Sequence, residues 1–158
     1  MSNQLQYVHE WLWAALEADP EFRELVPEPR RLKLSLFYDP ALSANISEAD
    51  TPMVGIFLNK IDFHPDAATN LTLVHVTFAV QLIIAGVNTR DVARLIWTIA
   101  KRLIEVRPNL LNDPNIYDCV LMESETKYVV SGRIGTLTVC FIQIDIKVPT
   151  ATLRNTGG

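Results

Sequence analysis

Residues 70–85 read NLTLVHVTFAVQLIIA, an alternation of apolar and other residues that is typical of one long β-strand. Six apolar side chains share one face: Val74, Val76, Phe78, Val80, Leu82 and Ile84. The other face begins with Leu71 and Leu73 and continues with His75, Thr77, Ala79 and Gln81. A strand of about 15 residues spans about 50 Å, whereas a compact chain of this length has a diameter of about 40 Å. The strand is therefore expected to project from its domain.

The preceding segment turns this strand into a projecting hairpin. Pro52–Phe63 alternates as a second strand, and His64–Thr69 supplies a turn whose tip lies near Asp66. Projecting strands carry unpaired N–H and C=O groups, which monomers normally hide. We therefore expect the hairpin to meet another subunit. The predicted interface residues lie at the tip, beside it and in the C-terminal tail: Phe63, His64, Pro65, Asp66, Leu71, Leu73, His75 and Leu153.

Helical patterns flank the hairpin. Asn3–Ala18 is predicted as an amphipathic helix, and Asp19-Pro20-Glu21 combines an N-cap with a proline at the first helical position. After a break at Gly86-Val87-Asn88, apolar residues recur at helical spacing, with Asn88 as the N-cap. Pro108 is expected to end this central helix, because proline lacks the N–H that continues the ladder.

Further strands complete the expected fold. Arg31–Tyr38 alternates, with Leu32, Leu34 and Leu36 predicted to point inward. The last three strands are expected at Ile116–Met122, Lys127–Ser131 and Leu137–Val148. The pattern predicts one α+β domain over residues 1–149. A mainly antiparallel sheet with a long projecting β-hairpin is packed by the N-terminal helix and the central helix. Residues 150–158 are expected to form a flexible polar tail.

Composition narrows the class of protein. The chain has 158 residues, is 49% hydrophobic and carries a formal net charge of -4. A dedicated nucleic-acid binder is disfavoured, because such proteins carry a basic excess. The two cysteines, Cys119 and Cys140, fall in apolar strand patterns and are expected as buried thiols, although a bridge between neighbouring strands stays open. No signal peptide or membrane span is expected.

The search for catalytic or metal-binding patterns yields little. His9, His64 and His75 lack metal-ligand spacing with another His, Cys or acidic residue. Glu123 and Glu125 flank a polar turn, where solvation explains them, and Asp145 is expected to pair with a neighbour at the surface. No phosphate loop, dinucleotide fingerprint or nucleophile elbow is present. We therefore expect a protein without cofactor, metal or catalytic residues.

The layout as a whole carries a family resemblance. An N-terminal helix precedes the first strand, and the long strand Leu71–Ala85 is followed by a break at Gly86-Val87-Asn88. The helix Thr89–Val106 and late strands ending with Thr138–Lys147 come next. This organisation resembles the tail terminator (tail completion) proteins of long-tailed bacteriophages.

The resemblance implies a structural virion protein. Such proteins form a homohexameric ring on the last ring of the tail tube, stop tube growth and offer their opposite face to the neck or head-completion protein. DNA passes through the lumen without specific binding. The implied location is the virion tail or neck, with the host cytoplasm during assembly and no membrane contact. Two alternatives stay open: another neck or tail-tube subunit, and a small α+β ligand-binding domain or enzyme with a hidden pocket.

Overall fold

The computed structural model describes residues 4–38, 51–66, 70–85, 89–122, 128–131 and 134–149. These residues form one five-stranded sheet. Its strands are ordered β1 (Met53–Asp66), β2 (Leu71–Ala85), β5 (Ile134–Pro149) and β3 (Ile116–Met122), and β4 (Tyr128–Ser131) also pairs with β5. Every paired neighbour is antiparallel. The predicted α+β fold with a mainly antiparallel sheet is therefore confirmed.

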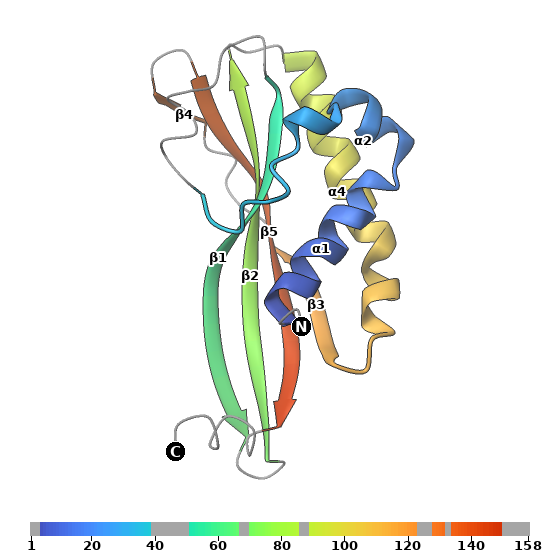
Figure 1. Ribbon diagram of the computed structural model, residues 1–158, viewed down its shortest axis with the longest axis vertical. Coiled ribbons are helices and arrows are strands. Elements are labelled where there is room, and N and C mark those ends of the chain that lie inside the picture. Colours follow the sequence, from blue (N-terminus) through green and yellow to red (C-terminus); the bar gives the residue numbers. More distant parts are fainter. Residues whose placement is uncertain are drawn as a thin grey trace.

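Three helices cover one face of this sheet (Figure 1). They are α1 (Gln4–Glu17), α2 (Pro20–Leu25) and α4 (Thr89–Leu111), and a short 3-10 turn, η1 (Glu28–Arg30), follows α2. We call the side that carries these helices the helix face and the other side the bare face. The upper part of the bare face is also covered, since Met53, Phe57 and Ile83 are buried there. The apolar face predicted for β2 points to the helices, and Val76, Phe78 and Val80 are fully buried there.

The projecting hairpin is wider than predicted. β5 pairs with β2 along its whole length, from Leu71 opposite Pro149 to Ala85 opposite Ile134. The lower ends of β1, β2 and β5 extend together beyond the helices (Figure 1). His64–Asp66 was expected as turn but belongs to β1, so the paired strands continue to Asp66 opposite Leu71. The projection is thus a three-stranded arm, whose central strand has partners on both sides.

The segment expected as a strand at Arg31–Tyr38 is not one. Its backbone meets β1 at two points, through a bridge from Arg31 to Val54 with a bond from Leu32 N–H to the Val54 carbonyl, and through a bond from Leu58 N–H to the Leu36 carbonyl. The Tyr38 ring also packs edge-on against Phe57 of β1. Between the two backbone contacts the chain turns, and Leu34 is fully exposed rather than inward. The leucine alternation therefore reflects two separate anchor points instead of a continuous ladder.

The central helix passes the proline that was expected to end it. α4 runs from Thr89 to Leu111 with Pro108 inside its last turn. Pro108 leaves the Ile104 carbonyl without its helical donor, and Ile104 lies on the exposed side of α4, where water can take that role. Val106 and Leu110 are buried on the opposite side and hold the last turn against the core. The predicted cap Asn88 lies outside the described residues.

The start of α2 gives a direct test of the local sequence signal. The Asp19 carboxylate accepts hydrogen bonds from the backbone N–H groups of Glu21 (2.8 Å) and Phe22 (3.3 Å). Asp19→Ala should therefore lower the free energy of unfolding by about 1 kcal/mol, while Asp19→Asn keeps most of the cap. Urea unfolding of the three proteins measures this difference. Equal stability of wild type and Asp19→Ala would show that the cap is not needed.

A buried histidine links α1 to the sheet. His9 lies on α1, its Nε2–H donates to the Ile56 carbonyl at 2.7 Å, and its ring centroid lies 5.9 Å from that of Phe78. Burial lowers the pKa of His9, and this effect outweighs the opposing influence of the Ile56 carbonyl and of Glu10. The folded protein therefore binds the proton of this imidazole less readily than the unfolded chain does.

That difference makes stability depend on pH. The unfolded chain takes up the His9 proton near the ordinary histidine pKa of about 6.5, and the folded protein takes it up only at lower pH. The contribution of neutral His9 to the free energy of unfolding should thus be fully present above pH 6.5 and should decrease as the pH is lowered below that value. Thermal or urea unfolding from pH 7.5 to pH 5 tests this, and His9→Gln should show a flatter profile. Parallel profiles for the two proteins would exclude His9 as the cause.

Candidate interaction surface

The arm places the predicted interface residues on both faces of the sheet. Register pairs Phe63 with Val74 and His64 with Leu73, so Phe63 belongs to the helix face and His64 to the bare face. Phe63 is 61% exposed despite its apolar ring. On the same reasoning Pro65 lies on the helix face, and Leu71, Leu73 and His75 lie on the bare face, where they are half-buried. The side chain of Asp66 and all of Leu153 lie outside the described parts.

The outer edge of β1 divides into two halves. Its upper half is met by residues 31–36 through the bonds at Val54 and Leu58. Below that, the register shifts between Leu58 and Lys60, which marks a bulge at Asn59. From Asn59 to Asp66, no described strand pairs with the outer side of β1. We call this stretch the open lower edge.

At the opposite edge of the sheet, on β3, side chains bind the outward-facing backbone groups of Cys119. On β3, the Cys119 carbonyl accepts a hydrogen bond from Arg107 Nε of α4, and the Cys119 N–H donates to the Asp118 carboxylate at 2.8 Å. Arg107 and Asp118 also form an ion pair at 2.9 Å. These side chains occupy backbone groups that a further strand would need. The β3 edge is therefore blocked at Cys119, and it differs in chemistry from the open lower edge of β1.

A polar cluster ties the strands of the arm together on the bare face. Asp145 of β5 is only 6% exposed. Its carboxylate accepts from His75 Nδ1 of β2 at 2.7 Å and from the Gln143 amide at 3.1 Å. The His64 ring of β1 packs edge-on against His75, with ring centroids 4.3 Å apart. The cluster links all three strands of the arm, with His64 from β1, His75 from β2, and Gln143 and Asp145 from β5.

Asp145, which was expected to pair with a neighbour at the surface, has a different environment in the fold. The Asp145 carboxylate is instead buried and held by His75. The relevant signal is pairing register: once β2 and β5 are neighbours, His75 lies directly opposite Asp145. That relation joins residues 70 positions apart in the chain, so periodicity within either strand could not reveal it.

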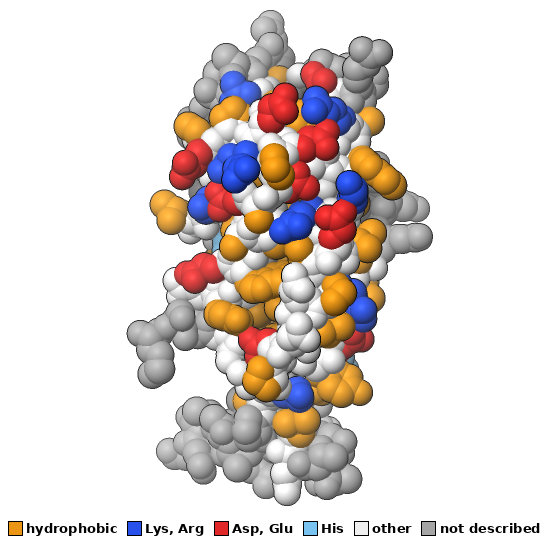
Figure 2. Space-filling model, turned by 90° about the vertical axis from the view of Figure 1, so that its right-hand side faces the viewer, with side chains coloured by type: hydrophobic (Ala, Val, Ile, Leu, Met, Phe, Trp, Pro, Cys, Tyr) orange, Lys and Arg blue, Asp and Glu red, His pale blue; other side chains and the backbone are white. Residues whose placement is uncertain are grey.

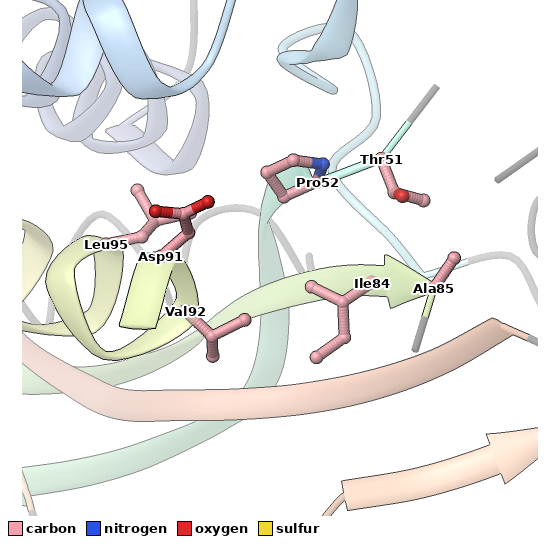
Figure 3. Close-up of a pocket in the computed structure, with 7 residues that line it drawn as sticks. All are labelled: Thr51, Pro52, Ile84, Ala85, Asp91, Val92 and Leu95. Atoms are coloured by element: carbon pink, nitrogen blue, oxygen red, sulfur yellow. The ribbon is translucent and has the colours of Figure 1, made fainter. Parts of the chain in front are cut away.

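Two open hollows of about 330 and 420 Å³ lie beside residues 31–36, and a smaller hollow at the upper end of the sheet is a further candidate for a small-ligand site (Figure 3). Its volume is about 220 Å³, below the roughly 300–1,000 Å³ that is usual for ligand pockets. The lining is mainly apolar, with Asp91 as its one carboxylate: Thr51, Pro52, Ile84, Ala85, Asp91, Val92 and Leu95. No nucleophile–base pair stands among these seven residues, so the hollow provides a place for a small molecule and no catalytic arrangement.

The helical side shows a further, smaller hollow. Figure 2 views this side and shows charges of both signs over its upper part, with apolar side chains gathered lower down. The hollow of about 50 Å³ lies between α1, α4 and β3 and is lined mostly by apolar side chains, including Trp11, Ile104 and Leu121. Its size admits a methyl or isopropyl group at most. It therefore adds an apolar surface feature without a recognisable ligand.

The two cysteines lie in neighbouring strands of the sheet, Cys119 in β3 and Cys140 in β5. Cys119 and Cys140 are buried free thiols, as predicted, and burial raises their pKa values to about 11 and about 12. Within the described ranges, no three His, Cys, Asp or Glu side chains are grouped so that they could hold a metal ion. None of the described helices is both long and apolar enough to cross a membrane.

Comparison of the sequence with protein-family models and with curated proteins finds no match.

Proposed function

We propose that this protein is a structural subunit of a long-tailed bacteriophage, which forms a ring that ends the tail tube and joins it to the neck. The order of elements supports the proposal: an N-terminal helix, a long hairpin, a central helix and late strands. The same order carries the resemblance to tail terminator proteins, from which the hexameric state and the tail-tube and neck partners are taken.

The open lower edge of β1 is the observation that carries the proposal. A projecting strand whose outer side meets none of the described strands, and which carries an exposed Phe63, is a liability in a monomer and a docking surface in an assembly. Because Arg107 and Asp118 occupy the backbone groups of Cys119 on the β3 edge, that edge and the open lower edge of β1 are not interchangeable. A contact between unlike surfaces is heterologous, and heterologous contacts close into rings when the rotation permits.

The layering of the subunit suggests how such a ring is oriented. The described helices lie on one face of the sheet (Figure 1), and the bulkier layer fits the outside of a ring. The lower part of the bare face, along the arm, then lines the lumen. Along the arm it carries Lys60, Asp62 and Lys147 beside the buried Asp145. This mixture of charges, in a chain of net charge -4, suits passage of DNA without specific binding.

Electron microscopy of purified tail tubes tests the proposal. Tubes mixed with the protein should carry one added ring at a single end and should stop elongating when free tube protein is supplied. A neck or tail-tube subunit predicts a different result, namely rings elsewhere or continued growth. Tubes that keep elongating and carry no added ring would contradict the proposal.

A small-molecule-binding domain is the second candidate, and the hollow in Figure 3 is the observation that favours it. Leu95→Trp should fill that hollow, because the side chain of Leu95 is part of its lining. Ring formation and tube capping should be unchanged in a variant that still folds, whereas a ligand-binding role predicts loss of a measurable small-molecule thermal shift.

A further inference from the structure

The open lower edge has a definite chemical pattern. On the helix face it presents Ile61, Phe63 and Pro65, and on the bare face Lys60, Asp62 and His64. Lys60 and Asp62 already pair at 3.1 Å, with both side chains largely solvated. A strand that docks here must supply an apolar side chain next to Phe63. On the other face it must place a neutral or basic side chain next to Asp62, because side chains alternate between the faces.

The C-terminal segment of this chain has that pattern. Residues 150–155 read TATLRN, in which Ala151 and Leu153 share one side while Thr152 and Arg154 share the other. β5 ends at Pro149, opposite Leu71, and Leu71 lies opposite Asp66 at the end of the open lower edge. The segment thus leaves the sheet at the same end of the molecule. It must turn back to meet β1, and a segment that does so runs antiparallel to β1.

We propose that residues 150–155 of one copy add to the open lower edge of a second copy as an antiparallel strand. Leu153 covers Phe63, and Arg154 lies beside Asp62. The inference rests on the proposed function, since it names the contact between subunits of the ring. The contact is heterologous, because each subunit gives a tail and receives one.

The distance that the segment would have to cross favours docking on a second copy rather than on its own chain. From Pro149 to the outer side of β1 the segment would cross three strand spacings, about 14 Å in all at about 4.8 Å each. That crossing takes about four residues at full extension. Leu153 would then still be at the crossing rather than beside Phe63. A neighbouring copy whose β1 edge faces Pro149 removes the crossing.

Disulfide trapping between two full-length single variants tests the proposal. F63C and L153C are mixed under mild oxidation, and cross-linked peptides are identified by mass spectrometry. The native thiols compete little, because burial raises the pKa values of Cys119 and Cys140 to about 11 and about 12. F63C mixed with W97C is the matched control, since Trp97 is exposed on α4, which packs over β3 and β5.

The expected result is a link between positions 63 and 153, formed on the order of 100-fold faster than the 63–97 link. Docking raises the effective concentration to millimolar against micromolar in free solution. Equal rates for the two mixtures would overturn the proposal. A dominant 63–63 link would indicate two-fold pairing of β1 edges instead. A link within single chains of the F63C/L153C double variant, diluted to nanomolar, would show that the tail covers its own subunit and would also overturn it.

Charge reversal provides an independent readout in solution. Asp62→Arg should weaken association of subunits, and the double variant Asp62→Arg/Arg154→Asp should restore it, because the opposite charges are exchanged between the two sites. Failure of the rescue, with both proteins folded, would contradict the pairing of these residues. If wild type forms rings and no 63–153 link appears, this inference fails and the proposed function stands. If the link appears without rings or tube capping, the proposed function fails.

Discussion

Truncation of Phe78 to alanine is expected to lower the free energy of unfolding by about 3–5 kcal/mol. Phe78 is fully buried at the middle of β2, the central strand of the long sheet. Its ring lies under His9 of α1, so the truncation opens a cavity where helix and sheet meet. Urea or thermal unfolding measures the loss directly.

The matched control is the same truncation at an exposed phenylalanine on the neighbouring strand. Phe63→Ala should change the free energy of unfolding by less than about 0.5 kcal/mol, because the ring is 61% exposed. Its effect should fall on association of subunits, which Phe78→Ala affects only through loss of fold. A large loss of stability in Phe63→Ala would mean that this ring belongs to the core of the free subunit and is no docking residue.

Shortening the arm is expected to abolish assembly while the domain still folds. Asp62 and His75 lie directly opposite each other, so residues 63–74 can be replaced by an Asn-Gly turn that closes the hairpin. The change removes Phe63 and the lower half of the open lower edge, residues 63–66. It also uncovers part of Ile146, which Val74 faces, at a cost of about 1–2 kcal/mol.

Circular dichroism and sedimentation of this shortened variant separate the two effects. A native spectrum with a monomer boundary is the expected outcome. A variant that keeps the Asp62–His75 pair but inserts four residues between positions 67 and 69 is the control, and it should assemble normally. Rings formed by the shortened variant would show that the arm takes no part in assembly.

Local patterns predict the long elements of this fold well. Both ends of β2, Leu71 and Ala85, follow from an unbroken alternation flanked by turn residues. The Asp19 cap is likewise a local signal, since the carboxylate bonds to N–H groups two and three residues ahead. In each case the atoms that make the structure lie within a few residues of one another, so the sequence window contains the cause.

The sequence-based predictions are wrong at positions where contacts between residues distant in the chain determine the structure. Arg31–Tyr38 has a strand-like alternation, but Leu32 and Leu36 meet β1 at separate points and the chain turns between them. Pro108 is tolerated because burial of Leu110 outweighs one missing hydrogen bond in the last turn. Both outcomes depend on tertiary packing, which a periodicity of neighbouring residues does not contain.

For the candidate surface too, local features could be predicted from the sequence, whereas features that depend on distant residues could not. Exposure of Phe63 near the tip follows from the length of the hairpin, which the sequence indicates. The separation of Phe63 and His64 onto opposite faces, and the burial of Asp145 beneath His75, require the register among three strands. The asymmetry between the open edge of β1 and the edge of β3 covered by Arg107 depends on α4 lying beside β3.

Sedimentation velocity of the wild-type protein across a wide concentration range tests the central claim, assembly through the arm, most directly. We expect a single discrete species larger than a dimer, with the hexamer that the resemblance implies, and we expect Phe63→Asp to remain a monomer under the same conditions. Phe63→Leu should still assemble, because it keeps an apolar side chain at the edge. A wild-type protein that sediments as a monomer at every concentration, or a Phe63→Asp variant that assembles as the wild type does, would contradict the account.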